Sequence, residues 1–206
     1  PERVLDLIHN FIIYDNNVKK ICRYKQYFAV KKCMKRILLQ DGVDTRNGVV
    51  WHTQGSGKTI TMIMLTKMIL RESMKPGSSI TRQRFVMVTD RINLDKQIRD
   101  NFIHTQMSPH RAKTGKGLIE LLKEDGNTVI TALVNKFEAA VKQEYCNDSE
   151  NIFVFIDEGH RTQYGKLNIY MNRVLPNAVK IAFTGTPLMQ KKPKDDKRNV
   201  MSATDT

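Results

Sequence analysis

Apolar residues along the chain follow two patterns, short continuous runs and longer stretches with helical spacing. The continuous runs cover residues 48–53, 85–90, 128–133, 152–157 and 179–184. Such runs are typical of strands that are covered on both faces, as in a parallel sheet. Between the runs, apolar residues recur every three or four positions, for example at Leu94, Ile98 and Phe102. This alternation predicts an α/β fold with a mainly parallel sheet and helices on both faces.

The two ends of the chain interrupt this alternation and set the expected domain limits. Residues 18–40 predict a further helix, with an apolar stripe opposite a lysine-rich face. We expect one α/β domain over residues 18–190, preceded by an arm or linker over residues 1–17 that arrives from another domain. Residues 191–206 are polar and rich in lysine, so we expect an exit segment there. Because the chain begins at Pro1 rather than at a methionine, we expect a piece of a longer protein.

The charge of the chain narrows the choice of partner. The sequence holds 34 lysine and arginine residues against 21 aspartate and glutamate residues, a formal net charge of +13. Such an excess attracts polyanions, since each neutralised phosphate releases condensed counterions. Nucleic acid is therefore the first candidate partner. A basic surface that only aids solubility, or one that docks on an acidic protein, remains an alternative.

Cysteine usage and hydropathy bear on the compartment. The three cysteines are scattered, without a CxxC pair or metal-ligand spacing. This usage favours a reducing compartment, and we expect the cytoplasm. No run approaches 18 apolar residues, so the pattern predicts no membrane-spanning helix.

A glycine-rich segment between the first expected strand and a helix carries the strongest chemical signal. It consists of Gly55, Ser56, Gly57, Lys58 and Thr59. Glycines let backbone N–H groups turn towards phosphates, and the helix N-terminus adds partial positive charge. Lys58 would reach the β- and γ-phosphates, and the Thr59 hydroxyl would bind Mg²⁺. The match to GxxxxGK[ST] is partial, because His52 stands where the first glycine belongs.

A second signal lies at the end of the apolar run at residues 152–157. The run ends in the carboxylate residue Asp157, and a second carboxylate residue, Glu158, follows it. Asp157 would hold the Mg²⁺ ion that bridges the phosphates, and Glu158 would orient and polarise the attacking water. A third signal, Thr184-Gly185-Thr186, again follows a strand. The hydroxyls of Thr184 and Thr186 could bond to His160 or to the carboxylates, although the same residues also suit a plain turn.

One competing motif is rejected on its residues. Asn135-Lys136-Phe137-Glu138 resembles the guanine-reading NKxD element of GTPases, but its last residue is Glu. The DxxG element of GTPases is also absent, since Asp157 is followed by glycine at the wrong spacing. The sequence therefore does not support a GTPase.

Taken in order, these motifs resemble those of superfamily 2 helicases and translocases. The resemblance implies a RecA-like P-loop domain and adds nucleotide contacts at Thr53 and at an upstream glutamine element with Arg23 and Gln26, where Gln26 would read adenine. The segment around Arg91 looks like motif Ia and the region of Thr131 looks like motif Ib. Both motifs imply contacts with nucleic acid, and the residues at 184 and 186, together with His160, imply a coupling role.

A finer resemblance is to the motor (R) subunit of type I restriction enzymes. It is carried by His52–Thr59, by residues 89–97, by the long stretch 157–165 and by residues 183–187. It implies an ATP- and Mg²⁺-dependent translocase on double-stranded DNA, in bacteria or archaea, working with modification and specificity subunits. In that family a nuclease domain precedes the motor and a second motor lobe supplies an arginine finger. We therefore expect an isolated first lobe that binds ATP weakly and hydrolyses it poorly.

Two other functions stay open at this point. One is a different superfamily 2 member, such as an RNA helicase or a chromatin-type remodeller. The extended stretch 157–165 argues against this alternative. The other is a nucleotide-gated binding module without turnover. Loss of Lys58 or Glu158 would be its sign, and both residues are present.

Overall fold

Helices and strands alternate through most of the chain in the computed structural model, which describes residues 2–38, 43–53, 55–124, 126–157, 164–185 and 200–202. The helices are α1 Glu2–Asn10, α2 Tyr24–Leu38, α3 Val43–Arg46, α4 Lys58–Ser73, α5 Ile92–His104, α6 Gly115–Lys123, α7 Val134–Lys142 and α8 Tyr164–Val174. The strands are β1 Ile12–Asp15, β2 Val18–Ile21, β3 Gly48–Trp51, β4 Arg84–Thr89, β5 His110–Ala112, β6 Thr128–Leu133, β7 Ile152–Asp157, β8 Val179–Thr184 and β9 Val200–Ser202.

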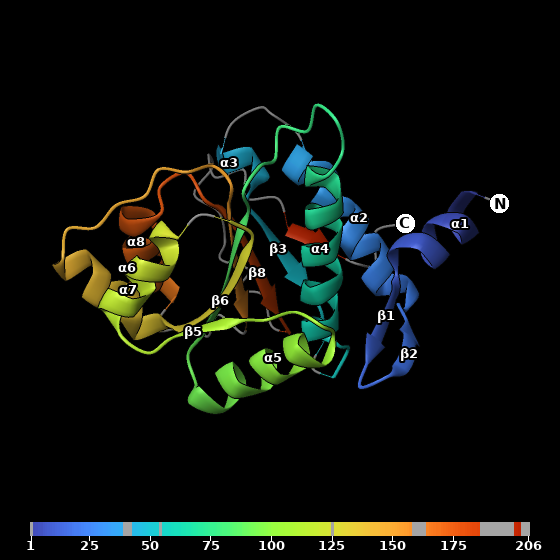
Figure 1. Cartoon of the computed structure of the whole chain (residues 1–206), viewed down its shortest axis with the longest axis horizontal. Helices are drawn as coiled ribbons and strands as arrows, with labels where there is room; N and C mark the ends of the chain where they lie inside the picture. The colour runs from blue at the N-terminus through green and yellow to red at the C-terminus, as the bar shows by residue number, and fades with distance from the viewer. Residues whose placement is uncertain are drawn as a thin grey trace.

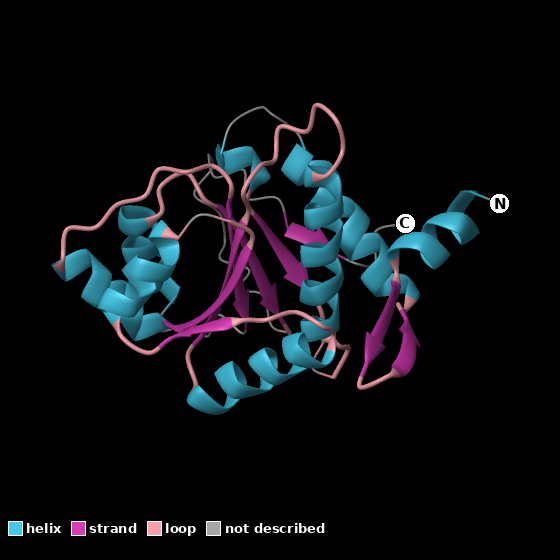
Figure 2. Cartoon of the chain, viewed as in Figure 1, coloured by secondary structure: helices cyan, strands magenta, loops and turns pink. Residues whose placement is uncertain are grey.

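The central sheet has the order β5-β6-β4-β7-β8-β3-β9, and every neighbouring pair in it is parallel. Figure 2 shows the sheet as the middle layer, with helices on either side. In Figure 1, α6, α7 and α8 cover one face, while α2 and α4 cover the other. The expected α/β fold with a parallel sheet is confirmed.

Alternate residues of the strands divide the core into two clusters. On β7, Phe153 and Phe155 pack with α2 and α4, whereas Ile152, Val154 and Ile156 pack with α6, α7 and α8. All six residues of β7 are buried. Burial on both faces explains why this strand is a continuous apolar run in the sequence rather than an alternating one.

The first residues differ from the expected arm. Residues 2–10 form α1, and β1 pairs antiparallel with β2, so the limit expected at residue 18 falls inside a hairpin. Asn16 and Asn17 make its turn with positive φ angles of 48° and 62°, as two-residue hairpins require. Phe11 and Ile13 are buried in the same core cluster as α2 and α4. Whether another domain precedes this unit stays a prediction.

The last residues are described only in part. Residues 200–202 form β9, which extends the sheet beside β3. The rest of the exit segment expected over residues 191–206 lies outside the described residues. None of the described helices combines the length and hydropathy needed to cross a membrane.

Candidate nucleotide site

The glycine-rich segment lies between the end of β3 and the start of α4. Gly55 and Gly57 have φ angles of 77° and 85°, in the left-handed region that glycine adopts without strain. Gly57 is the N-cap residue of α4, and no side chain caps the helix at that position. The first N–H groups of α4 therefore point into the segment together with the positive end of the helix dipole. This arrangement suits an anion such as a phosphate.

Gln26, on α2, holds this loop from behind. Its side-chain Nε2 donates to the carbonyl oxygens of Ser56 at 3.3 Å and Gly57 at 3.1 Å. Its Oε1 accepts from the backbone N–H of Arg23 at 2.9 Å. Gln26 is only 5% exposed, so the amide is a fixed part of the loop's support in this structure. The upstream glutamine element and the phosphate loop, distant in sequence, are thus brought together.

The Gln26 amide also approaches the Cα atom of Gly57 closely. A Cβ atom at Gly57 would lie 2.7 Å from the Gln26 Nε2 atom, closer than real Cβ contacts allow. A Cβ atom at Gly55 would meet nothing within 4 Å. Of the two glycines, Gly57 is therefore the one at which a side chain, besides having a strained φ angle, would shift the Gln26 amide.

Strand register brings the carboxylate Asp157 to the same edge of the sheet. Asp157, the last residue of β7, pairs with Phe183 on β8, and the next residue of β8, Thr184, pairs with Trp51 on β3. The ends of three adjacent strands are therefore level, with the loop that leads to Lys58 following β3. Asp157 is 8% exposed. A carboxylate so placed can face a cation held at the loop, together with the partly buried Thr59 hydroxyl.

His52, which replaces the expected first glycine, is 2% exposed. Burial lowers the pKa of its imidazole below the ordinary value of 6.5, and the cations of Lys25 and Lys58 lower it further. A hydrogen-bonding contact with the Lys25 backbone acts in the opposite direction. His52 is therefore neutral at pH 7 and adds no charge to the loop.

Some predicted residues lie outside the described residues, namely Glu158, His160 and Thr186. Their roles stay predictions. Thr184 is described, and its backbone carbonyl accepts from the His52 N–H at 2.9 Å. Thr53 is exposed, and its carbonyl accepts from the Ser56 N–H at 3.1 Å, which closes the start of the loop.

The two residues predicted to contact DNA have different surroundings. Arg91 precedes α5, is exposed and pairs with Asp90 at 3.6 Å. Thr131 lies within β6 and is 1% exposed. Its side chain is not available at the surface of this structure, so a direct contact with DNA is compatible with Arg91 only.

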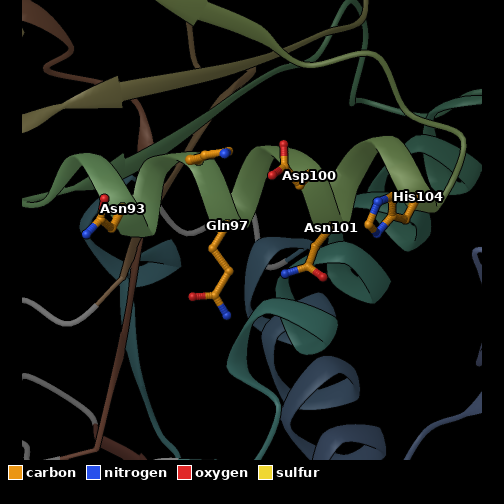
Figure 3. Close-up of a pocket in the computed structure, with 6 residues that line it drawn as sticks. Asn93, Gln97, Asp100, Asn101 and His104 are labelled. Atoms are coloured by element: carbon orange, nitrogen blue, oxygen red, sulfur yellow. The ribbon is translucent and has the colours of Figure 1, made fainter.

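A shallow polar hollow of about 460 Å³ lies on α5. Its lining residues all come from this one helix (Figure 3) and are Asn93, Lys96, Gln97, Asp100, Asn101 and His104. Side chains from a single helix face do not enclose a ligand, and we assign no site to the hollow.

Trp51 makes a contact near the site that the sequence alone does not indicate. Its indole Nε1 donates to the Gly185 carbonyl at 3.1 Å, so the residue just before His52 contacts the segment that follows β8. The available signal is that the chain's single tryptophan directly precedes the glycine-rich motif.

Relatives of known name share this sequence over most of its length. A putative type I restriction enzyme MjaIXP endonuclease subunit from Methanocaldococcus jannaschii is 34% identical over 195 residues, which cover 91% of this chain and 18% of the relative. The type I restriction enzyme HindI endonuclease subunit from Haemophilus influenzae is 32% identical over 216 residues, 91% of this chain and 20% of the relative. The chain thus spans about a fifth of the length of these relatives.

Solved structures share the fold. The SWI2/SNF2 ATPase core of Sulfolobus solfataricus in complex with double-stranded DNA superposes with a TM-score of 0.63 at 15% identity, over 90% of this chain and 35% of that one. A nuclease-deletion mutant of the Type ISP restriction-modification enzyme LlaGI, bound to a DNA substrate mimic, gives 0.60 at 17% identity, over 89% and 19%.

The family model described as SWI2/SNF2 ATPase matches residues 25–203. The match begins one residue before Gln26 and includes the phosphate loop, Asp157 and β9, so it covers the site described above except for Arg23. The resemblance to superfamily 2 motors and to type I restriction subunits is confirmed. This chain belongs to the SWI2/SNF2 ATPase family.

Proposed function

We propose that this chain is the first ATP-binding lobe of the motor in a type I restriction endonuclease subunit. In the complete assembly it couples ATP hydrolysis to movement along double-stranded DNA. The observation that carries the proposal is the glycine loop at the C-terminal end of β3, level with the Asp157 carboxylate two strands away. Relatives that share 32–34% of its residues and bear the names of type I subunits support the type of motor.

The residues of the site fit ATP with Mg²⁺. Two left-handed glycines and the uncapped start of α4 form a cradle for phosphate oxygens. Lys58, the first residue of α4, supplies a cation to the β- and γ-phosphates. Thr59 and Asp157 are hard oxygen ligands of the kind that Mg²⁺ prefers. Bound Mg²⁺ would neutralise charge that develops on the phosphates during hydrolysis.

Hydrolysis transfers the γ-phosphoryl group to water and leaves ADP and inorganic phosphate. In this proposal Lys58 stabilises the negative charge that develops on the transferred phosphoryl group, and Asp157 would hold the Mg²⁺ ion. By resemblance, Glu158 accepts the proton of the attacking water. The neutral His52 leaves Lys58 as the only cation that the loop itself directs at the phosphates.

Adenine recognition is assigned to Gln26 by resemblance. The amide of Gln26 is already bonded to the loop carbonyls of Ser56 and Gly57 and to the Arg23 N–H. To bind adenine, Gln26 would therefore use a spare lone pair of its Oε1 atom or give up one of its present hydrogen-bond partners. Gln26 would then link base recognition directly to the shape of the phosphate loop.

The motor is proposed to move along duplex DNA, and this lobe is proposed to contact the phosphate backbone of the DNA. The net charge of +13 and the exposed Arg91 at the start of α5 support phosphate contacts. Phosphate contacts carry no base information. We therefore propose that this lobe has no sequence preference, and that modification and specificity subunits select the DNA site.

Turnover by this chain alone is proposed to be slow. By resemblance, a second motor lobe supplies the arginine finger, and such a finger raises turnover by about 10³-fold or more in related phosphoryl-transfer enzymes. We expect ATP hydrolysis by the chain well below about 1 s⁻¹. A rate of several per second without any other protein would contradict this part of the proposal.

Calorimetric titration of the chain with ATP and Mg²⁺ tests the nucleotide site. Lys58→Ala should weaken ATP binding by about tenfold or more, because it removes a charge-assisted contact to phosphate. Lys116→Ala is the matched control, since Lys116 also lies in the first turn of a helix and its side chain is 80% exposed. GTP should bind more weakly than ATP. Equal loss in both variants, or no loss in either, would overturn the assignment of the loop.

A further inference from the structure

The end of β3 is joined to the end of β8 more extensively than strand pairing requires. Trp51 and Thr184 are register partners, and the ladder continues one residue further through the His52 N–H bond to the Thr184 carbonyl at 2.9 Å. The Trp51 side chain then adds a second bond, from Nε1 to the Gly185 carbonyl at 3.1 Å. Two successive carbonyls, of the last residue of β8 and of the residue after it, thus accept from Trp51 and His52, which lead into the phosphate loop.

The side chain of Trp51 is placed for this contact rather than for burial. It is 38% exposed, in contrast to the phenylalanines of β7 and β8, which are buried almost completely. A tryptophan usually directs its N–H to a specific acceptor and leaves its apolar body to packing. Here the indole bond spans from the strand before the loop to the chain after β8, and the β-ladder alone would not hold Gly185.

We propose that Trp51 is a positioning residue that couples the phosphate loop to the backbone at Thr184 and Gly185. When phosphate binds the loop, the shift at the end of β3 is transmitted through the indole N–H to the Gly185 carbonyl. The coupling rests on the proposed ATP site, since it needs an occupant for the loop. Trp51 lies outside the recognised motifs, and its side chain would link the ATP site to the backbone at the end of β8.

Hydrogen exchange of a peptide over residues 179–185 measures the coupling. Magnesium tripolyphosphate is the probe, because it occupies a phosphate loop without placing a base near the tryptophan. In the parent chain, saturating probe should slow exchange of the Gly185 amide by about fivefold, because a firmer bond to the Gly185 carbonyl reduces local opening of the backbone that carries this amide. In Trp51→Phe the probe should still bind within about threefold of the parent, but exchange at Gly185 should change by less than about twofold.

Tyr14→Phe is the matched control, because it removes a polar group from an aromatic side chain that is 52% exposed and far along the chain from the loop. It should keep the full response at Gly185. An unreduced response in Trp51→Phe, at equal probe binding, would overturn the coupling and leave the nucleotide site intact. Absence of probe binding to the parent in calorimetry would instead overturn the proposed nucleotide site, and the coupling with it.

Fluorescence gives a second measurement that needs no variant at Trp51. The chain has one tryptophan, so all indole emission reports on this position. Saturating tripolyphosphate should change that emission in the parent and leave it unchanged in Lys58→Ala. Constant emission while calorimetry records binding would overturn the proposal even if Trp51→Phe did not fold.

Discussion

Individual side chains around the loop divide into those that shape it and those that serve bound phosphate. Gly57 and Gln26 shape it, because the left-handed glycine leaves room for the amide that bonds to its carbonyl. Lys58, Thr59 and Asp157 are the residues proposed to serve phosphate and metal. The following predictions separate these two roles.

Gly57→Ala should reduce both stability and ATP affinity, the latter by about tenfold. A left-handed alanine costs about 1–2 kcal/mol, and its Cβ would also displace the Gln26 amide 2.7 Å away. Gly77→Ala is the control, since Gly77 has a φ angle of 77° and open space around it, far from the loop. It should cost stability alone. Equal ATP affinity in the two variants, measured by calorimetry, would contradict the role given to Gly57.

Gln26→Leu should weaken the binding of tripolyphosphate as well as ATP, by about fivefold or more, because the Ser56 and Gly57 carbonyls lose a buried donor. A greater loss for ATP than for tripolyphosphate would support adenine reading by Gln26 in addition. If only ATP binding weakened, the amide would not support the loop, contrary to the structure.

His52 makes stability depend on pH near neutrality. Its pKa is lowered in the folded chain, chiefly by burial, so the unfolded chain binds the proton more readily. The stabilising effect of a neutral His52 is therefore present above pH 6.5 and is lost as the pH falls below it. Denaturant unfolding at pH 7.5 and pH 5.5 should show a smaller decrease for His52→Gln than for the parent. If stability decreased equally in His52→Gln and in the parent, His52 would not be the cause of the pH dependence.

At the level of elements, α1 attaches to the domain through polar contacts and through Leu7, which packs against the core. Tyr27 on α2 donates to Asp6 at 2.8 Å, and Lys31 pairs with the same carboxylate at 3.1 Å. Arg71 on α4 donates to the carbonyl of His9 at 2.6 Å. The apolar residues on the other side of the helix stay exposed, namely Val4, Leu5 and Ile8. Polar contacts together with the partly buried Leu7 thus position α1.

Tyr27→Phe should loosen α1, because Asp6 loses a partly buried donor worth about 1 kcal/mol. Hydrogen exchange over residues 2–10 should accelerate while the central sheet stays protected. Tyr14→Phe, at an exposed position on β1, should have no such effect. Faster exchange throughout the sheet would show that Tyr27 supports the whole domain instead.

Sequence patterns predicted five strands of the sheet within one or two residues, because these strands are mostly apolar and β4, β6, β7 and β8 are mostly buried. They did not predict β5, which has three residues of which only Ala112 is buried. They also missed α1, because its contacts through Asp6 and Arg71 leave Val4, Leu5 and Ile8 exposed and Leu7 only partly buried. The adjacent asparagines Asn16 and Asn17 are the local sequence signal for the hairpin turn.

Parts of the candidate site's geometry could likewise be predicted from the sequence. Contacts set by local motifs, such as the glycines of the loop and the carboxylate at the end of β7, can be read from short stretches of sequence. The bond from Trp51 to Gly185 joins residues far apart in the chain and depends on strand order. So does the burial of Thr131, which the motif alone placed at a DNA surface.

For the whole molecule, the charge of +13 should control DNA binding. Affinity for duplex DNA should fall steeply with salt and should not depend on base sequence. Arg91→Ala should lower the steepness of this salt dependence by about one phosphate contact. Arg173→Ala, an exposed substitution on α8, is the control and should leave it unchanged. A preference of about tenfold for one duplex sequence over another would contradict backbone binding.

The most direct test of the central claim is a crystal structure of the chain with Mg²⁺ and a non-hydrolysable ATP analogue. We predict phosphate density in the loop between Gly55 and Thr59, with the Lys58 ammonium on the β- and γ-phosphates. The metal ion should lie between the Thr59 hydroxyl and the Asp157 carboxylate. Nucleotide bound elsewhere on the domain, or a metal ion without Asp157 near it, would contradict the assignment of this loop as the motor's ATP site.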